Sequence, residues 1–164
     1  MSRDLPASIE PLHLAKIGMT LAGSLPLVKM ERIKESLCDS HGEVYIHWSF
    51  FQDDQGRSVI QGKIHTQLSL QCQRCLQPMT YQVEAPVALM IISNSTEPDD
   101  LQTEYETLEL TPTPVSLLTL VEDELILALP LVVMHEHCPS NKFVNASPED
   151  LTYNPFHILA KLKQ

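Results

Sequence analysis

Apolar and polar residues alternate along three long stretches in the first half of the chain. Residues 43–51 have apolar side chains at Val44, Ile46, Trp48 and Phe50. Residues 57–71 repeat this pattern, and residues 80–92 resume it. Alternation with a period of two is typical of strands that bury one face. The turn QDDQG, with Gly56 where a positive φ is favoured, joins the first two stretches, so the pattern predicts a long β-hairpin.

The remaining pattern in this half predicts shorter elements. Residues 13–27 alternate in part, and we expect a strand there. Residues 27–37 place apolar side chains among charges at helical spacing, which predicts an amphipathic helix. Residues 105–110 predict a short strand. Gly62 interrupts the apolar positions of the second hairpin strand and predicts a β-bulge.

Two helices are expected in the second half. Thr113 and Pro114 are a favoured helix start, because the first turn has no partner for the N–H that proline lacks. Pro130 ends this helix. Residues 139–153 are polar and predict a loose linker, and residues 154–164 predict a short helix capped by Asn154.

Strands therefore come first along the chain and helices follow. This order predicts an α+β fold rather than alternating α/β units. We expect a β-rich antiparallel sheet or a partly closed barrel with two or three helices. With 164 residues, the chain fits one domain, which we assign to residues 1–138.

Charge is distributed unevenly along the chain. The formal net charge is −10, and between Cys75 and Ser140 there are eleven carboxylates and no lysine or arginine. Such a surface repels phosphate and favours a basic protein as partner, although acids that only confer solubility are an open alternative. A small RNA-binding patch would form if Arg57, Lys63 and Arg74 shared one sheet face. Because the acidic half of the chain repels RNA, we expect any direct RNA contact to be weak.

Targeting and catalytic motifs are absent from the sequence. The start MSRDLPASIEPLH lacks the apolar stretch of a secretory signal. The sequence also contains no run of about 18 apolar residues, which a membrane-spanning helix would require. We therefore expect a cytoplasmic protein. There is no phosphate-binding loop and no nucleophile or zinc-protease motif. The sequence thus predicts neither an enzyme nor a small-molecule substrate.

The cysteines carry the clearest chemical signal. The stretch QCQRCLQP places Cys72 and Cys75 at CxxC spacing near a turn between two strands, and MHEHC places His135 three residues before Cys138. Together these residues form a candidate Cys₃His zinc site, since structural zinc prefers four such ligands. Two alternatives stay open at this point: buried thiols without a metal, and a redox pair.

The predicted helix around residues 114–130 has one apolar face. That face is formed by Leu117, Leu118, Val121, Leu125 and Ala128. Glu122 and Asp123 should point away from it, whereas Glu124 lies beside it. A carboxylate at that position reaches water or needs a partner, such as a loop amide, a lysine or another protein.

Three motifs in this order resemble one family. QCQRCLQP, VEDELILALPLVVMHEHC and NPFHILAKLK are similar to segments of YceD, the large ribosomal RNA subunit accumulation proteins, and the resemblance covers residues 15–164. It implies a bacterial cytoplasmic protein that is needed for normal accumulation of 23S rRNA and has no established enzymatic activity. HEHC stands where some members carry a second cysteine pair. The landmark positions that carry over are Cys72, Arg74, Cys75, Glu122, Asp123, Glu124, Cys138, Asn154, Pro155 and Phe156.

The resemblance and the charge distribution together lead to one hypothesis and one alternative. The hypothesis is a non-enzymatic ribosome biogenesis factor that contacts pre-large-subunit particles or a basic ribosomal protein. The alternative is a zinc-stabilised protein-interaction module in another pathway. The candidate partner-binding residues are Arg74, Glu122, Asp123, Glu124, Asn154, Pro155 and Phe156.

Overall fold

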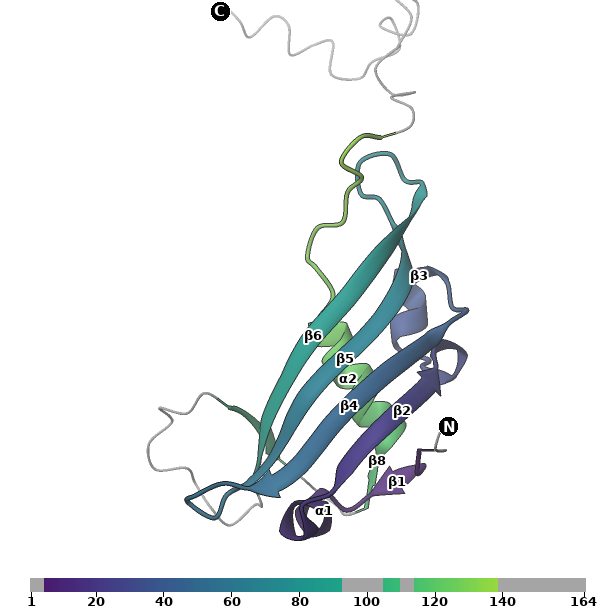
Figure 1. Ribbon diagram of the computed structural model, residues 1–164. Coiled ribbons are helices and arrows are strands. Elements are labelled where there is room, and N and C mark those ends of the chain that lie inside the picture. The colour runs from purple at the N-terminus through teal and green to yellow at the C-terminus, as the bar shows by residue number, and fades with distance from the viewer. Residues whose placement is uncertain (1–4, 93–104, 110–113, 139–164) are drawn as a thin grey trace, which may run out of the picture.

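The computed structural model describes residues 5–92, 105–109 and 114–138. It is an α+β fold, as predicted: a long twisted sheet has helix α2 packed across one face (Figure 1). The strand order is β2-β4-β5-β6-β7, and β3 also pairs with β5. The elements are β1 (Ser8–Ile9), α1 (Pro11–Ile17), β2 (Thr20–Pro26), the 3₁₀ turns η1 (Leu27–Lys29) and η2 (Ile33–Ser36), β3 (Leu37–Asp39), β4 (Glu43–Gln52), β5 (Ser58–Gln71), β6 (Pro78–Ile92), β7 (Glu106–Glu109), β8 (Val115–Ser116) and α2 (Leu117–Leu127).

The predicted hairpin is confirmed and is continued by a third long strand. β4 pairs antiparallel with β5, and β5 pairs antiparallel with β6 without a break from Ser58↔Ile91 to Gln71↔Pro78. Gly56 in the β4–β5 turn has φ +75°, as expected. The apolar positions of the alternating pattern are buried, namely Val44, Ile46, Trp48, Phe50, Ile60, Ile64, Leu68 and Leu70.

Gly62 does not form the predicted bulge. It lies in regular register opposite Trp48. A Cβ at this position would lie 2.0 Å from the carbonyl oxygen of His47, so β4 passes too close for any side chain. The glycine therefore allows the backbones of β4 and β5 to approach closely and does not mark an extra residue in the strand.

The sheet is open rather than closed into a barrel, and it is mixed rather than purely antiparallel. β7 pairs parallel with β6, but only over residues 89–92 of β6. On that side, residues 78–88 of β6 have no neighbouring strand among the residues described. This free edge lies beside the C-terminal half of α2.

Two predictions for the N-terminal region were wrong. Residues 13–27 are not one strand, because α1 occupies 11–17 and Gly18, with φ +66°, ends it before β2 begins. Residues 27–37 are not an α-helix but two 3₁₀ turns. The buried residues here are Leu27, Met30 and Ile33. Their spacing of three matches the 3₁₀ repeat and not the 3.6 residues of an α-helix.

Helix α2 begins later than predicted. The side chain of Ser116 caps it by accepting a hydrogen bond of 3.2 Å from the N–H of Thr119. Pro114 therefore precedes the helix, because β8 (Val115–Ser116) first pairs with β1. Thr113 lies outside the described residues. The helix ends at Leu127, shortly before Pro130.

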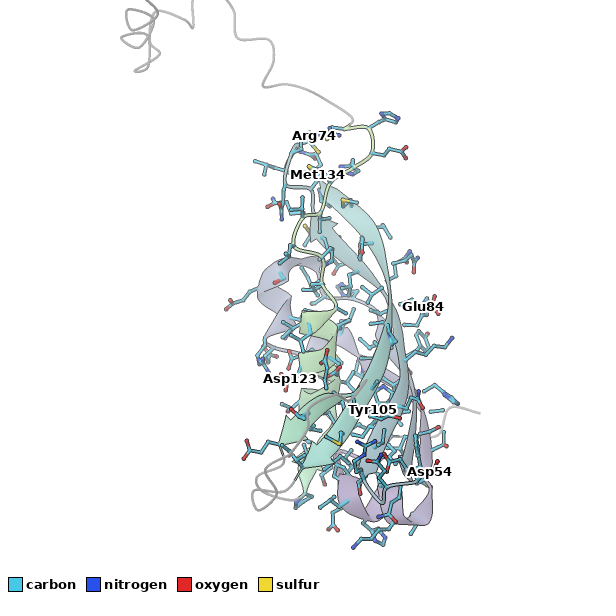
Figure 2. All side chains as sticks on the ribbon, turned by 90° about the vertical axis from the view of Figure 1, so that its left-hand side faces the viewer. Asp54, Arg74, Glu84, Tyr105, Asp123 and Met134 are labelled. Carbon is cyan, nitrogen blue, oxygen red and sulfur yellow. The ribbon has the colours of Figure 1, made fainter. Side chains whose placement is uncertain are left out.

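One acidic residue of α2 points into the protein, contrary to our expectation. Glu122 is only 5% exposed. Its Oε1 accepts hydrogen bonds from the backbone N–H groups of Arg32, at 2.7 Å, and Ile33, at 3.1 Å. The neighbouring Asp123 forms an ion pair with the Arg32 side chain. These contacts attach α2 to the turn η2. Figure 2 shows Asp123 on the side of the sheet that α2 covers and Glu84 on the opposite side.

The predicted linker 139–153 and the predicted C-terminal helix 154–164 lie outside the described residues. Among the residues described, no helix is long and apolar enough to cross a membrane.

Replacing Glu122 tests its role in attaching α2. Glu122→Ala removes the acceptor for two backbone N–H groups, one buried and one partly buried, and should lower the free energy of unfolding by about 3 kcal/mol. Glu122→Gln keeps one acceptor oxygen and should lose about half as much. Urea denaturation followed by circular dichroism measures both. Equal losses for the two variants would contradict a role as hydrogen-bond acceptor.

Candidate metal centre

The tip between β5 and β6 forms a tight turn that carries the CxxC pair. The N–H of Leu76 donates to the Cys72 carbonyl at 2.8 Å, and the N–H of Cys72 donates to the Gln77 carbonyl at 2.9 Å. Leu76 has φ +60°, a conformation that costs roughly 1–2 kcal/mol for a residue with a side chain. The turn thereby directs backbone N–H groups of Arg74 and Cys75 at the Cys72 sulfur, and that of Gln77 at the Cys75 sulfur.

The segment after α2 returns to this tip. The N–H of Gln73 donates to the Val133 carbonyl at 2.8 Å, and its side-chain amide donates to the Leu131 carbonyl at 3.2 Å. Val133 itself is buried. These contacts position His135 and Cys138 against the turn, although more than 55 residues separate them from it in sequence.

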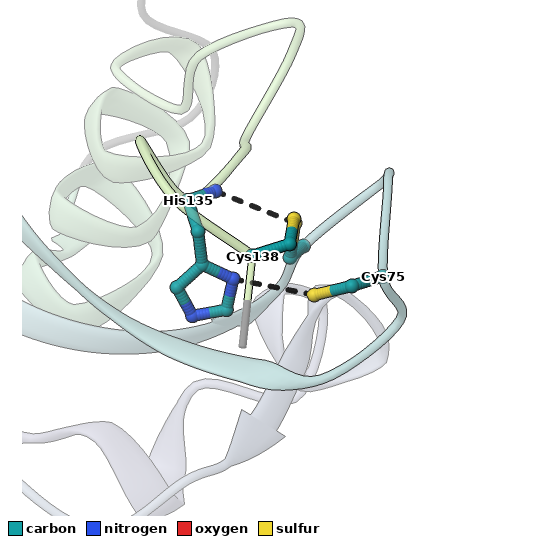
Figure 3. A group of neighbouring side chains, drawn as sticks. Cys75, His135 and Cys138 are labelled. Carbon is teal, nitrogen blue, oxygen red and sulfur yellow. Dashed lines mark hydrogen bonds between the residues drawn. The ribbon is translucent and has the colours of Figure 1, made fainter. Parts of the chain in front are cut away.

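The four predicted ligands come together. One ligand atom from each of Cys72, Cys75, His135 and Cys138 lies within 4.8 Å of all the others. The sulfurs of Cys72 and Cys138 are 3.9 Å apart, and the Cys75 sulfur is 3.4 Å from Nδ1 of His135 (Figure 3). A tetrahedral zinc ion with ordinary bond lengths requires about 3.8 Å between two sulfurs and about 3.5 Å between sulfur and nitrogen. The group therefore has the donors and the size that zinc requires.

The geometry also separates this group from the remaining cysteine and histidine candidates. At 3.9 Å, Cys72 and Cys138 are not joined by a disulfide, which needs about 2.05 Å. His137 is exposed and does not belong to the group, so His135 is the candidate histidine ligand. Cys38 is exposed on β3 and lies outside it.

The turn changes the acidity of the two CxxC thiols in opposite directions. Burial disfavours the charged form of Cys72, but the N–H groups of Cys75, His135 and Arg74 outweigh it and lower its pKa to about 5. For Cys75, the N–H of Gln77 favours the thiolate, but burial and the sulfurs of Cys72 and Cys138 raise its pKa. Several N–H groups aimed at one sulfur are the arrangement that stabilises a metal-binding thiolate.

Arg74 links the two halves of the site. Its Nε donates to the Cys138 sulfur at 2.9 Å, and one terminal nitrogen donates to the carbonyls of His135, at 2.8 Å, and Glu136, at 3.2 Å. The guanidinium of this predicted partner-binding residue is thus engaged within the protein. A cation beside three sulfurs also offsets the negative charge that ionised thiols bring.

Among the other predicted partner-binding residues, the three that the structure describes lie on α2 and not beside Arg74 at the tip. Glu122 is used inside the fold, and Asp123 pairs with Arg32. Glu124 is half-buried on α2, and its pKa is raised by burial and by the charges of Glu106 and Asp123. Asn154, Pro155 and Phe156 lie outside the described residues.

The three cations considered for RNA binding do not gather. Arg57 and Arg74 lie at opposite ends of β5, a strand of 14 residues, and are therefore roughly 45 Å apart. Arg57 pairs with Asp53 at 2.6 Å, and Lys63 lies 3.5 Å from Glu84. The sheet therefore offers no combined basic patch from these three residues.

Sequence reasoning missed two features of the acidic region. Glu106, on the short strand β7, lines the same surface cavity as Glu124, and only the parallel pairing of β7 with β6 places it there. Glu122 was assigned to the wrong side of α2, because the polar backbone of η2 replaces an apolar neighbour at that point. An acid that is buried because it binds backbone N–H groups leaves no periodic pattern of apolar and polar residues in the sequence.

Comparisons with known proteins identify relatives of this chain. The family model described as "Large ribosomal RNA subunit accumulation protein YceD" matches residues 60–163. A protein of that name from Haemophilus influenzae is 35% identical over 168 residues, and the match covers 98% of this chain and 97% of the relative. No solved structure matches.

Removing the Arg74 side chain should loosen the contact between the tip and the segment after α2. In Arg74→Ala, we expect the Gln73 amide to exchange its hydrogen about tenfold faster, because three bonds that hold residues 135–138 are lost. Amides in the middle of β5 should be unchanged. Hydrogen–deuterium exchange measures both, with Arg57→Ala at the opposite end of β5 as the control. Unchanged exchange at Gln73 would show that Arg74 does not hold the two halves together.

Proposed function

The chain belongs to the YceD family, and we propose that it is a non-enzymatic biogenesis factor for the large ribosomal subunit that acts through protein contacts. The observation that carries this proposal is the 35% identity with a protein named for large ribosomal RNA subunit accumulation. That identity extends over nearly the full length of both chains. We propose that this chain likewise supports the synthesis, processing or accumulation of 23S rRNA in the cytoplasm.

We further propose that the Cys₃His group holds a structural zinc ion. Four protein ligands complete a tetrahedral site and leave no position for water or substrate, whereas catalytic zinc keeps one position open. The zinc would supply a fixed cross-link between the β5–β6 tip and the segment after α2. This role supports a binding function and does not require catalysis.

Contact through protein rather than RNA is supported by the charges. The residues from 76 to 139 contain no lysine or arginine. In the N-terminal half, Arg57, Lys63 and Arg74 are separated along β5, and each lies beside a carboxylate or a sulfur. Affinity for RNA depends on clustered cations that displace counterions from phosphates. A basic ribosomal protein fits this surface better than rRNA itself.

The metal content of the purified protein tests the zinc proposal. Protein prepared without a chelator should contain about one zinc per chain by elemental analysis. Cys72→Ser and Cys138→Ser should each lose most of it, and Cys38→Ser, which alters an exposed cysteine outside the group, should retain it. A folded wild-type protein without metal would refute the proposal.

Association with large-subunit precursors tests the proposed function. The tagged chain, purified from its host at low salt, should carry large-subunit ribosomal proteins with it. If the contact is to protein, these should remain bound after ribonuclease treatment. Loss of every ribosomal component with ribonuclease would contradict a protein contact.

A second outcome of this purification would change the function itself. If the protein holds zinc but no large-subunit component binds with or without ribonuclease, the ribosomal proposal fails. The Cys₃His group would then favour the alternative, an interaction module in another pathway.

A further inference from the structure

A groove lies between α2 and the free edge of β6. It has a volume of about 350 Å³ and is lined by Ala85, Pro86, Ala88, Glu106, Glu124, Leu127 and Ala128. Its floor consists of small or aliphatic side chains from β6 and α2, and its two ionisable groups are both carboxylates. The groove is distinct from the Cys₃His group, which lies at the β5–β6 tip.

The two carboxylates of the groove come from different elements. Glu124 projects from the middle of α2, and Glu106 is the first residue of β7, where it pairs with Leu89 of β6. Burial raises the pKa of Glu124, and the negative charges of Glu106 and Asp123 raise it further. A cation between the two carboxylates would relieve the repulsion of these charges.

None of the residues that line this groove carries a positive charge. Asp123, next to Glu124 in sequence, is paired with Arg32, but no ion pair to Glu106 or Glu124 occurs among the residues described. No lysine or arginine occurs in sequence between Cys75 and Ser140 either. The elements that form the groove therefore contain acids and no bases.

The shape of the groove matches a long cationic side chain. The aliphatic stem of lysine or arginine packs well on apolar surface, while its charged end needs a carboxylate. Ala85, Ala88 and Leu127 offer that surface beside Glu106 and Glu124. Pro86 has no N–H to donate, which disfavours the addition of a partner strand to this edge of β6 and leaves side-chain contacts as the means of binding.

An exposed apolar segment continues from the groove toward the tip. Leu127 is 72% exposed and Leu131 is 95% exposed, and Val132 and Met134 are also exposed. Figure 2 shows Met134 close to Arg74 at the tip. Exposed aliphatic side chains that continue from an acidic groove can bind a partner segment that carries both apolar and basic residues.

We propose that the groove between α2 and β6 binds a lysine- or arginine-bearing segment of a protein partner, with the cation held between Glu106 and Glu124 and its stem packed on Leu127. This inference rests on the proposed function and adds the location of the partner's contact. The occupant is a protein and not RNA, because two carboxylates at the centre of the groove repel phosphate.

Zero-length cross-linking tests this inference. The full-length protein is mixed with large-subunit ribosomal proteins that have been freed of rRNA, and a carbodiimide joins carboxylates to lysines that lie in contact. Mass spectrometry of the products should show Glu124 or Glu106 linked to a lysine of a ribosomal protein. Cross-links from the groove to Lys142, Lys161 or Lys163 of the chain itself, in place of such links, would overturn the inference.

Variants test the carboxylates and the apolar floor separately. The double variant Glu106→Gln/Glu124→Gln should capture at least tenfold less of the cross-linked ribosomal protein. Glu10→Gln/Glu43→Gln makes the same change in charge at exposed sites outside the groove and should capture as much as the wild type. Leu127→Asn, at an exposed position, should also weaken capture. Equal loss in both double variants would show attraction by net charge alone and would overturn the inference.

The same variants distinguish this inference from the proposed function. If the groove variant still carries ribosomal proteins from ribonuclease-treated cells as well as the wild type does, the groove is the wrong site but the function stands. If the wild type carries none, the function itself fails. Preferred binding of added 23S rRNA over the ribosomal proteins in the purified mixture would also overturn the inference.

Discussion

The unbroken pairing of β5 with β6 is the constraint on which the remaining structure depends. Fourteen residues of β5 face β6 in one register, so the turn that joins them extends to the end of the sheet. There the turn presents two cysteines beyond the main apolar core, where their sulfurs face the returning chain. The same pairing places the other edge of β6 beside α2. Both candidate sites, the Cys₃His group and the acidic groove, thus depend on this one strand pair. Figure 1 shows β5 and β6 running side by side along the sheet.

Helix α2 connects the two candidate sites. Its apolar residues pack on the inner face of the sheet, and the buried Glu122 attaches it to η2 through two backbone N–H groups. With α2 held at that point, its C-terminal end directs the following residues toward the tip, where Gln73 and Arg74 donate hydrogen bonds to the carbonyls of Val133 and His135. A metal ion at the tip would stabilise an arrangement that hydrogen bonds already define, rather than create it. The four protein ligands, which leave no open position, favour a structural role for the ion over a catalytic one.

The sequence predicted the sheet well because alternation over long strands is a strong signal, and Trp48, Phe50 and Ile64 are buried as expected. It also singled out the four candidate ligands that the structure brings together, because CxxC and HxxC spacings reflect the geometry of a turn. It failed where local and tertiary effects compete. Leu27, Met30 and Ile33 keep the spacing of three that 3₁₀ turns have, and over so few residues it differs too little from helical spacing to be distinguished in the sequence. Glu122 is buried because it accepts hydrogen bonds from backbone N–H groups, which leave no periodic pattern. Glu106 lies in the groove because β7 pairs parallel with β6, and the alternation of apolar and polar residues does not specify that pairing.

X-ray absorption at the zinc edge, on protein purified without a chelator, measures directly whether the four candidate ligands close one metal site. We expect three sulfur neighbours at about 2.3 Å and one nitrogen neighbour at about 2.0–2.1 Å, with no water bound to the zinc. Such a spectrum would show that Cys72, Cys75, His135 and Cys138 close one site between the tip and the segment after α2. A first shell of oxygen and nitrogen atoms, or one with fewer than three sulfurs, would contradict it.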